Sequence, residues 1–249
     1  MPMAVLVTGG AKRLGAIIVR RLASEGHHVV IHYRSSGDAA RDLANETGAA
    51  GVVQGDLADT RGLGDLFARA CAVAGGSIGA LVNSASAFDY DTPPELNPDL
   101  LDRLHAIGHA APALLASALA RQDDLSGGAV VNILDQKIAN LNPDFYSYTT
   151  GKIALAGASA MLAQALGPRI RVNAVAPGLS LPSGDQSDEE FGAVASKNLL
   201  KRPVDPNDIA DAVAFLIEAR RIEGQTIFVD AGQRFCKRDR DVMFERARG

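Results

Sequence analysis

Short apolar runs alternate with longer amphipathic segments along nearly the whole 249-residue chain. The apolar runs are rich in valine, isoleucine and leucine, as expected of parallel strands that are buried on both faces. The intervening segments repeat their apolar residues every three to four positions, which predicts helices. The alternation predicts a single-domain α/β fold, a doubly wound parallel sheet of about seven strands with helices on both faces. The expected strands are Ala4–Thr8, Val29–Tyr33, Gly51–Gly55, Ala80–Asn83, Ala129–Leu134, Ile170–Val175 and Gln225–Val229, and the expected helices are Leu14–Glu25, Asp38–Glu46, Arg61–Ala74, Asp99–Arg121, Tyr146–Leu166 and Asn207–Glu218.

Two segments depart from this alternation. The polar segment 178–201 follows the sixth expected strand, at the edge where a doubly wound sheet places its ligand crevice. We expect a substrate lid there, and an ordinary surface loop is the alternative. Residues 1–235 form the single domain in this interpretation, and residues 236–249 form a charged C-terminal tail. We expect that tail to be a helix that is solvated or contacts another subunit.

Composition argues against several classes of protein. The net charge of −4 disfavours a broad nucleic-acid surface. The two cysteines, Cys71 and Cys236, lack metal-ligand spacing, so we expect no metal and a reduced, cytoplasmic protein. No apolar run reaches membrane-spanning length, and the first residues do not resemble a signal peptide. The expected partner is a small-molecule substrate.

A glycine-rich turn, Thr8–Gly15, follows the first expected strand and opens the first expected helix. A pyrophosphate approaches the amides at a helix N-terminus closely only where the backbone lacks bulky side chains. Gly9 and Gly15 meet that requirement. The position of the turn between strand and helix is typical of a Rossmann-type dinucleotide-binding fold.

The end of the second expected strand indicates which dinucleotide is bound. Sites that prefer NAD usually carry an acidic residue there, which accepts a hydrogen bond from the adenosine ribose. The segment His32–Ser36 has no acid, and the guanidinium of Arg34 suits a 2′-phosphate. Because Arg13 lies in the adjacent turn, we expect NADP; solvated arginines are the alternative. Asp56 and Leu57, after the third strand, are expected at the adenine edge, or alternatively as a helix cap.

Tyr148 and Lys152 lie four residues apart on an expected helix and therefore share a face. A free phenol has a pKa of about 10, which is too high for easy proton exchange near neutrality. A nearby ammonium favours the phenolate and lowers that pKa. We therefore expect Tyr148 to protonate a substrate atom while a nicotinamide delivers a hydride.

These motifs together resemble the short-chain dehydrogenase/reductase superfamily, from Met3 to about Phe235. The resemblance implies that Lys152 also binds the nicotinamide ribose, that Asn83 borders the cofactor and that the assembly is a homotetramer or homodimer. It rests on Thr8–Gly15, Gly55–Leu57, Val82–Ala85, Tyr148–Lys152, Arg171–Asn173 and Pro177–Gly178. The cofactor-binding residues expected from the residues and the resemblance together are Gly9, Lys12, Arg13, Leu14, Gly15, Tyr33, Arg34, Ser35, Asp56, Leu57, Asn83, Ser84, Ala85, Tyr148, Lys152, Pro177, Gly178 and Ser180.

Two positions indicate which group within the superfamily the chain resembles. Most members of the superfamily have glycine where Arg13 stands and a catalytic serine where Asp135 stands. In both respects the chain is similar to the pteridine reductases, including the dihydromonapterin and dihydrofolate reductases of the superfamily. That similarity extends to the segment Asn83–Phe88 and implies that Ser86 touches a pterin ring. It also implies that Phe88 stacks the ring against the nicotinamide.

The chemistry of a carboxyl group also supports a role for Asp135 in the reaction, independently of the resemblance. A carboxylate near Tyr148 opposes ionisation of the phenol, which Lys152 partly offsets. A carboxyl group suits a C=N bond or a guanidine-like ring edge, because it donates a hydrogen bond when protonated and accepts when charged. We expect Asp135 to be catalytic and to bind substrate; a surface residue that caps the next loop is the alternative.

One helix departs from the superfamily pattern. Gly108 occupies the position of an asparagine that usually kinks this helix and holds a relay water, so the relay is an open question. Pro112 is a second candidate for a kink. His105 and His109 lie on the same helix and are expected at a helix–helix contact or in solvent. A role for them in proton transfer or metal binding is the alternative.

The leading hypothesis is an NADPH-dependent reductase of a pterin-like substrate, with Tyr148 as the proton donor. A second hypothesis is an NADP-dependent reductase of a ketone, sugar or 3-oxoacyl substrate. A third, from another class, is a cofactor-binding sensor or scaffold with weak catalysis, because Gly108 and Ser84 replace groups that are frequent in the superfamily.

Overall fold

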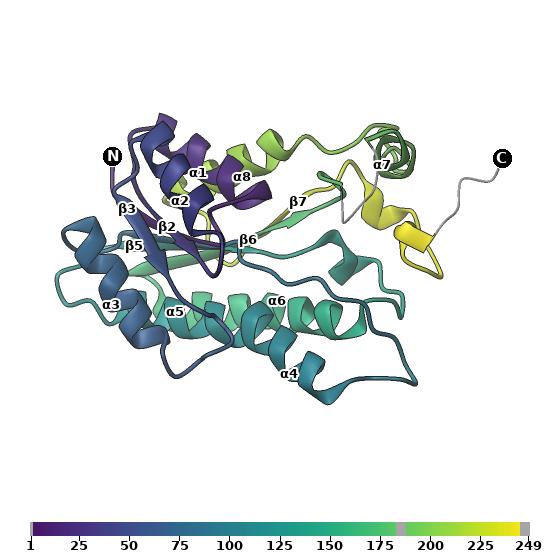
Figure 1. Cartoon of the computed structure of the whole chain (residues 1–249), viewed down its shortest axis with the longest axis horizontal. Coiled ribbons are helices and arrows are strands. Elements are labelled where there is room, and N and C mark those ends of the chain that lie inside the picture. The colour runs from purple at the N-terminus through teal and green to yellow at the C-terminus, as the bar shows by residue number, and fades with distance from the viewer. Residues whose placement is uncertain (1, 183–187, 245–249) are drawn as a thin grey trace.

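The computed structural model describes residues 2–182 and 188–244, with the side chains of 188–190 left out. Its centre is a parallel sheet of seven strands in the order β3-β2-β1-β4-β5-β6-β7 (Figure 1). The doubly wound fold expected from the sequence is therefore confirmed. From β1 the sheet grows in one direction through β2 and β3 and in the other direction through β4 to β7. The strand order therefore reverses between β1 and β4, and such a switch point opens a crevice at the carboxyl ends of the strands. The strands are β1 Ala4–Thr8, β2 His28–Tyr33, β3 Gly51–Gln54, β4 Ala80–Asn83, β5 Gly128–Ile133, β6 Ile170–Pro177 and β7 Thr226–Val229.

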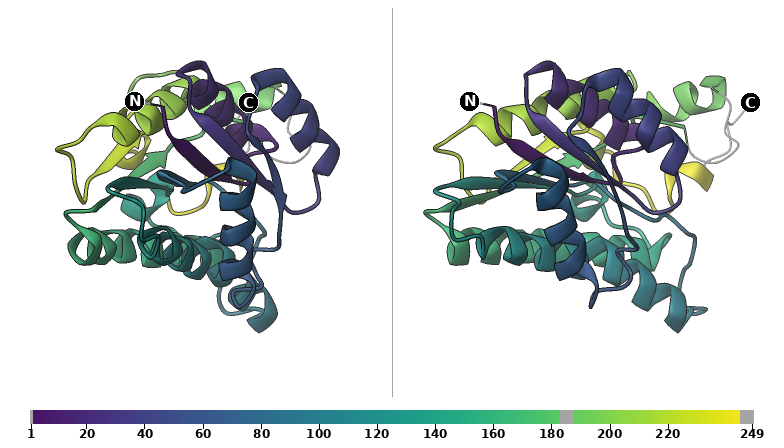
Figure 2. Two further views of the ribbon diagram at one scale, coloured as in Figure 1. Left: turned by 90° about the vertical axis from the view of Figure 1, so that its left-hand side faces the viewer. Right: turned by 60° about the vertical axis from the view of Figure 1, so that its left-hand side comes forward.

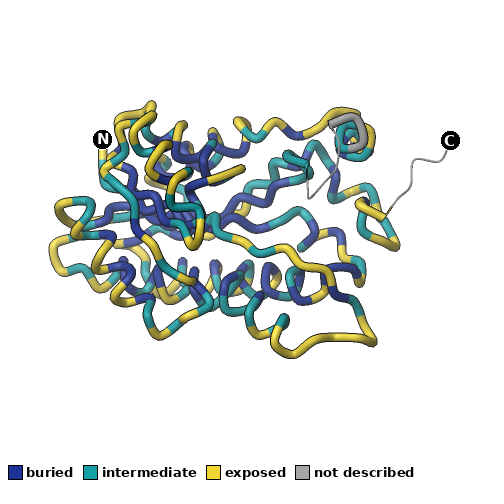
Figure 3. The backbone as a smooth tube through the Cα atoms, viewed as in Figure 1, coloured by how far each residue is buried: buried dark blue, intermediate teal, exposed yellow. Residues whose placement is uncertain are grey.

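Helices cover both faces of the sheet, in three layers (Figures 1 and 2). Val5 and Val7 of β1 pack toward one face and Leu6 toward the other, because successive side chains of a strand alternate. The central strands are buried almost throughout, the edge strands β3 and β7 less so, and the helices are exposed on their outer sides (Figure 3). One face carries α1 Arg13–Ser24, α2 Gly37–Thr47 and α8 Pro206–Glu218; the other carries α3 Leu63–Ala74, α4 Pro98–His105, α5 Ala111–Ala120 and α6 Tyr146–Leu166.

The long helix expected over Asp99–Arg121 is wrong as a single element. It divides into α4 and α5, with a π-helical turn, Ala106–Ala110, between them. Pro112 has no N–H to donate to the carbonyl of Gly108, four residues earlier, so regular α-helical bonding cannot continue there. The amide of Ala111 bonds instead to the carbonyl of Ala106, five residues back. The kink expected near Pro112 is thus a π-bulge.

The segment 178–201 is more regular than the lid or loop expected from the pattern, and the helix expected in the tail is wrong for its described residues, 236–244. The segment 178–201 contains a helix, α7 Asp188–Ala195, and part of the expected lid, residues 183–187, lies outside the described residues. In the tail the structure shows no α-helix over 236–244, but a 3₁₀ turn, Val242–Phe244, that follows an earlier one, Gln233–Phe235. In the described part of the chain, no helix is long and apolar enough to cross a membrane.

Candidate active site

A cleft of about 700 Å³ lies at the carboxyl ends of the strands. It brings together the two groups of residues that the sequence singled out, the glycine-rich turn and the Tyr148–Lys152 pair. The expected site residues that line it are Gly9, Lys12, Arg13, Leu14, Gly15, Tyr33, Arg34, Ser35, Asp56, Leu57, Ser84, Ala85, Ser86, Phe88, Asp135, Tyr148, Lys152, Pro177, Gly178 and Ser180.

Asn83, which was also expected to border the cofactor, is the one residue of that set that does not line the cleft. Its side chain is buried beneath the cleft and donates from Nδ2 to Oδ1 of Asn132, 2.8 Å away on the neighbouring strand. Asn132 in turn donates to Ser159 of α6 at 2.8 Å. Oδ1 of Asn83 is buried and has no hydrogen-bond partner among the described residues. Asn83 therefore links the sheet to α6 from below the cleft.

Two positions of the glycine-rich turn, Gly9 and Gly15, leave no room for a side chain. Gly9 has φ +63°, and a Cβ there would lie 2.7 Å from Cα of Ala85. A Cβ on Gly15 would lie 2.2 Å from the carbonyl oxygen of Gly9. Thr8, just before the turn, accepts hydrogen bonds from the amides of Ser84 and Ala85, both at 3.1 Å. The close packing of the backbone in this turn therefore requires glycine at both positions.

His32 holds this turn in place, a role that the sequence did not reveal. Its Nδ1 accepts from the amide of Gly9 at 3.1 Å, so Nε2 carries the proton and donates to the carbonyl of Gly55, also 3.1 Å away. Burial lowers the pKa of His32 to about 4, which keeps the ring neutral and this tautomer in place. Because His32 lies on β2, its imidazole links the segment after β1 to the segment after β3.

The far end of the cleft from Tyr148 is cationic. Arg34 and Ser35 are exposed there and Arg13 lies in the adjacent turn. Arg13 has φ +52° and donates from its guanidinium to the carbonyl of Pro182 at 2.6 Å. The two arginines expected for a 2′-phosphate therefore share one end of the cleft, and one of them also holds the segment that follows β6.

Tyr148 and Asp135 form a direct pair. The phenol of Tyr148, in the first turn of α6, donates to Oδ2 of Asp135 at 2.8 Å. The other carboxyl oxygen of Asp135 accepts from the amide of Lys137 at 2.8 Å, which caps a short 3₁₀ turn, Gln136–Ala139. One oxygen of Asp135 thus caps the next loop, which was the alternative expected for this residue, and the other oxygen contacts the phenol.

The pKa of Tyr148 shifts in the direction opposite to the one expected from Lys152. Burial and then the charge of Asp135 raise it well above 10. The ammonium of Lys152 lies 5.7 Å from the phenol ring centroid and donates to the carbonyl of Ile133 at 2.7 Å. Burial lowers the pKa of Lys152 to about 8, and burial also raises the pKa of Asp135. The phenol is therefore held in its protonated, proton-donating form.

Phe88 is part of an aromatic cluster at the substrate end. Its ring stacks on Phe145 with centroids 4.0 Å apart and meets the edge of Tyr148 at 4.8 Å. Phe145 also meets the edge of Tyr90 at 5.2 Å. Phe88 keeps 43% of its surface exposed, on the wall of the cleft. One face of its ring therefore packs on Phe145, and the side chain still reaches the cleft.

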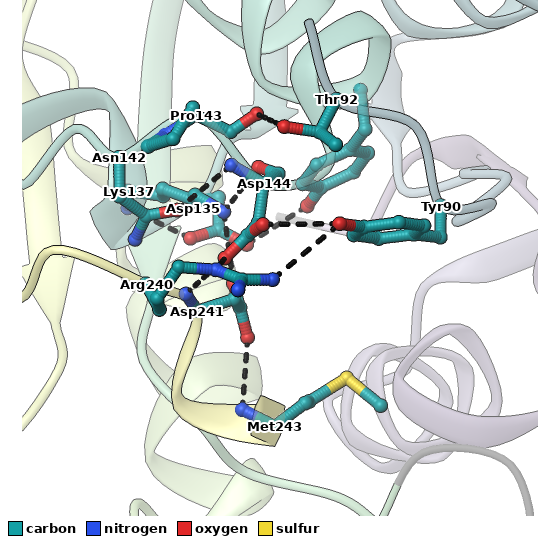
Figure 4. A network of polar contacts seen from close by, with 11 residues as sticks. Tyr90, Thr92, Asp135, Lys137, Asn142, Pro143, Asp144, Arg240, Asp241 and Met243 are labelled. Atoms are coloured by element: carbon teal, nitrogen blue, oxygen red, sulfur yellow. Dashed lines mark hydrogen bonds and ion pairs between the residues drawn. The ribbon is translucent and has the colours of Figure 1, made fainter. Parts of the chain in front are cut away.

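A buried charged network behind this cluster escaped the sequence analysis. The ammonium of Lys137 donates to the carbonyl of Asp144 at 2.6 Å and to Oδ2 of Asp241 at 2.8 Å (Figure 4). The carboxylate of Asp144 accepts from Arg240 and from the amide of Asp241, both at 2.7 Å, and from Tyr90 at 3.2 Å. Burial alone would raise the pKa of Asp144, but these hydrogen bonds lower it. The network fixes the tail residues 240–244 to the loop before α6.

The two histidines expected at a helix–helix contact lie on α4 (His105) and on the π-helical turn (His109). Nε2 of His105 lies 2.9 Å from the hydroxyl of Thr150 on α6, which makes it a helix–helix contact. Across the described residues, no group of three or more possible ligands could hold a metal ion. A Cβ on Gly108 would meet nothing within 4 Å, so packing does not require glycine at that position.

Comparison with known proteins places the chain among reductases. A family model described as enoyl-(acyl carrier protein) reductase matches residues 9–234. The chain is 43% identical to FolM alternative dihydrofolate reductase 1 from Brucella suis, whose crystal structure contains NADP, with a TM-score of 0.88 over 94% of this chain and 95% of that one. It is 26% identical to the dihydromonapterin reductase of Klebsiella pneumoniae over 93% of this chain and 97% of the relative. It is also 32% identical to the cyclic-di-GMP-binding biofilm dispersal mediator protein of Escherichia coli, over 91% and 94% respectively.

Proposed function

The chain belongs to the short-chain dehydrogenase/reductase family of NAD(P)-dependent oxidoreductases, and from that premise we propose that it reduces a C=N bond of a dihydropterin with NADPH. The observation that carries the proposal is the 2.8 Å hydrogen bond from Tyr148 to Asp135, at a position where most of the family has a serine. The similarity to a dihydrofolate reductase and to a dihydromonapterin reductase supports the same substrate class.

The residues of the cleft fit NADPH. The cleft extends from its cationic end at Arg13 and Arg34 to Tyr148 and Lys152. Between these ends lies the glycine-rich turn, whose glycines leave the backbone uncovered. In the proposal the two arginines and Ser35 hold the 2′-phosphate, the turn Gly9–Gly15 holds the pyrophosphate, and Lys152 holds the nicotinamide ribose. The cofactor would supply the hydride that adds to the carbon of the C=N bond.

Tyr148 would donate its proton to the nitrogen of the same bond. A phenol whose pKa is raised keeps that proton near neutrality, and it would give the proton up because hydride addition to the carbon makes the nitrogen strongly basic. Asp135, whose Oδ2 accepts the hydrogen bond of the phenol at 2.8 Å, would hold the phenol in place, and the phenolate left by the transfer would take its next proton from the cleft. In this scheme no relay water held by an asparagine at position 108 is needed.

Steady-state turnover of a 7,8-dihydropterin with NADPH tests this function. We expect oxidation of NADPH with the dihydropterin and none with simple ketones, sugars or 3-oxoacyl thioesters. In the variant Asp135→Ser, which restores the family's usual residue, we expect about a hundredfold lower dihydropterin turnover with unchanged NADPH binding. Turnover of a ketone or 3-oxoacyl thioester, with none of any pterin, would instead support the second hypothesis.

A binding protein without significant catalysis is the alternative of another class. It is motivated by the E. coli relative, which is named for binding cyclic-di-GMP. The paired Tyr148 and Asp135 favour an enzyme, because a sensor has no need of a positioned proton donor. Binding of cyclic-di-GMP in equilibrium dialysis, together with no NADPH oxidation with any of the substrates named above, would favour the sensor.

We also propose that the chain forms a homodimer or homotetramer. Leu114 of α5 and Ile153 and Met161 of α6 are exposed on two helices that pack side by side. Exposed apolar side chains gathered on neighbouring helices are typical of subunit contacts. Light scattering coupled to size exclusion would measure the mass, and a monomer of 26.0 kDa would contradict the proposal.

A further inference from the structure

The loop between β4 and α4, residues 84–97, lies against the segment that leads into α6. The phenol of Tyr90 donates to the carboxylate of Asp144 at 3.2 Å (Figure 4). The hydroxyl of Thr92 donates to the carbonyl of Pro143, also at 3.2 Å. On both sides of position 91, the loop is therefore attached to the residues that precede the helix of the catalytic pair.

Asp91, between these two contacts, bonds to α6 itself. Its carbonyl accepts from the amide of Tyr146 at 3.1 Å. One of its carboxyl oxygens accepts from the amide of Ser147 at 3.0 Å, and the other accepts from the hydroxyl of Ser147. Asp91 is only 6% exposed, and Ser147 is completely buried. A buried carboxylate from a distant loop thus meets the first two residues of the helix.

The helix depends on this contact because it has no cap of its own. The first amides of a helix have no partner within the helix, and the side chain of the residue just before it usually supplies one. In α6 that residue is Phe145, which has φ +53° and makes no side-chain hydrogen bond to the helix. Asp91, 56 residues before Ser147, takes its place, and a negative charge there suits the positive end of the helix dipole.

The position of the Tyr148 phenol depends on where this end of the helix lies. Tyr148 follows Ser147 directly, in the same first turn of α6. Its hydroxyl reaches Asp135 at 2.8 Å, and its ring meets that of Phe88 with centroids 4.8 Å apart. A displacement of about 1 Å within a catalytic site can lower the rate about 10²-fold. Because Phe88 lies in the same loop as Asp91, this one residue joins the proton donor to the loop that carries the aromatic wall of the cleft.

Resting on the proposed function, we propose that Asp91 is a positioning residue, which holds the start of α6 so that the phenol of Tyr148 meets both Asp135 and the bound substrate. The side chain of Asp91 is not part of the cleft wall, so it acts through the helix and not by touching a ligand. Lys152, one turn later, is held separately by the carbonyl of Ile133 at 2.7 Å. The rate of proton transfer therefore depends on Asp91, whereas the binding of NADPH does not.

Steady-state kinetics with a 7,8-dihydropterin compare Asp91→Ala with Asp91→Asn. Alanine removes both carboxyl oxygens, whereas asparagine keeps one oxygen for the amide of Ser147. We expect kcat to fall about 10- to 100-fold in Asp91→Ala with an unchanged KM for NADPH, and to stay within about threefold of wild type in Asp91→Asn. The control, Glu95→Ala at an exposed position in the same loop, should match wild type. If Asp91→Ala does not fold, Ser147→Ala replaces it throughout, with an expected fall in kcat of about threefold, because it removes the hydroxyl contact alone.

A measurement without substrate tests the same role. NMR of tyrosines labelled with ¹³C at Cζ reports the ionisation of each phenol, and the Tyr148 signal is the one lost in Tyr148→Phe. In wild type this phenol stays protonated above pH 10, because burial and the charge of Asp135 raise its pKa. In Asp91→Ala we expect the phenol to move away from Asp135, so that its pKa falls toward about 10. In Glu95→Ala the titration should be that of wild type.

Two results would overturn the positioning role: a Tyr148 titration in Asp91→Ala that matches wild type, or a wild-type kcat in that variant. Equal losses of kcat in Asp91→Ala and Asp91→Asn would also overturn it, because asparagine still accepts from the amide of Ser147. If wild type turns over no dihydropterin, the proposed function fails, and the NMR titration still decides the role of Asp91.

Discussion

The two ends of the cleft are built in different ways. At the cofactor end the glycine-rich turn presents its backbone and is held by neutral groups such as His32 and Thr8, and charged side chains enter only with the two arginines beyond it. The substrate end is a side-chain surface, formed by Tyr148, Asp135 and Phe88 and supported from behind by buried ions. A backbone surface suits a ligand that the whole family shares, whereas side chains and a charged network can differ from one relative to the next without disturbing the sheet.

The largest expected effect lies at the substrate end. Tyr148→Phe removes the proton donor but keeps the ring, so we expect kcat to fall about 10²- to 10⁴-fold. NADPH binding at the cofactor end should be unchanged in a fluorescence titration. The control is Tyr146→Phe, an exposed tyrosine on the same helix, which should keep full activity. Equal turnover by wild type and Tyr148→Phe would remove Tyr148 from the mechanism.

The charged support of the substrate end should be costly to break. Lys137→Met leaves Asp241 buried without its cation, and removing one partner of such a pair costs about 3–5 kcal/mol. We expect a matching fall in the free energy of unfolding from urea denaturation. Lys237→Met, at an exposed position in the same tail, is the control. A loss below about 1 kcal/mol would show that the network does not hold the tail.

The cofactor end should show a pH dependence of stability instead. The pKa of His32 is about 4 in the folded chain and 6.5 as a free side chain, so the unfolded chain binds more protons between these pH values. Stability from this group is therefore present above pH 6.5 and is lost as the pH falls toward 4, by about 3 kcal/mol. Unfolding measured across this range should be less pH-dependent in His32→Gln than in the control His28→Gln, at an exposed histidine. Identical pH profiles for the two variants would contradict this account.

The smallest expected effect is also at the cofactor end. Arg34→Ala should raise the KM for NADPH about tenfold, because an exposed arginine loses a charge-assisted contact with phosphate. The KM for NADH, which lacks the 2′-phosphate, should not change. Arg41→Ala on α2 is the matched control, since Arg41 is exposed and pairs only with Asp38 among the described residues. A parallel change for both cofactors would place the phosphate elsewhere.

The same contrast explains what the sequence could predict. The turn Thr8–Gly15 and the pair Tyr148–Lys152 are local, so spacing along the chain already places their chemistry. Lys137 and Asp241 are 104 residues apart, and no pattern in either segment indicates that they meet. The shift in the Tyr148 pKa went undetected for a related reason: spacing shows which charge is near, but burial, which dominates the shift, depends on the packing of the whole site. The π-bulge arises from Pro112, which the sequence flagged without indicating the form of the kink.

The hydrogen bond from Arg13 to the carbonyl of Pro182 has a consequence for protein engineering. A common aim with such reductases is to exchange the costlier phosphorylated cofactor for NADH by replacing the arginines at the adenosine end. In this chain Arg13 also anchors the start of the segment after β6, which lines the cleft at Gly178–Leu181. Replacing Arg13 would release that segment as well, so Arg34 is the safer position at which to begin a cofactor exchange.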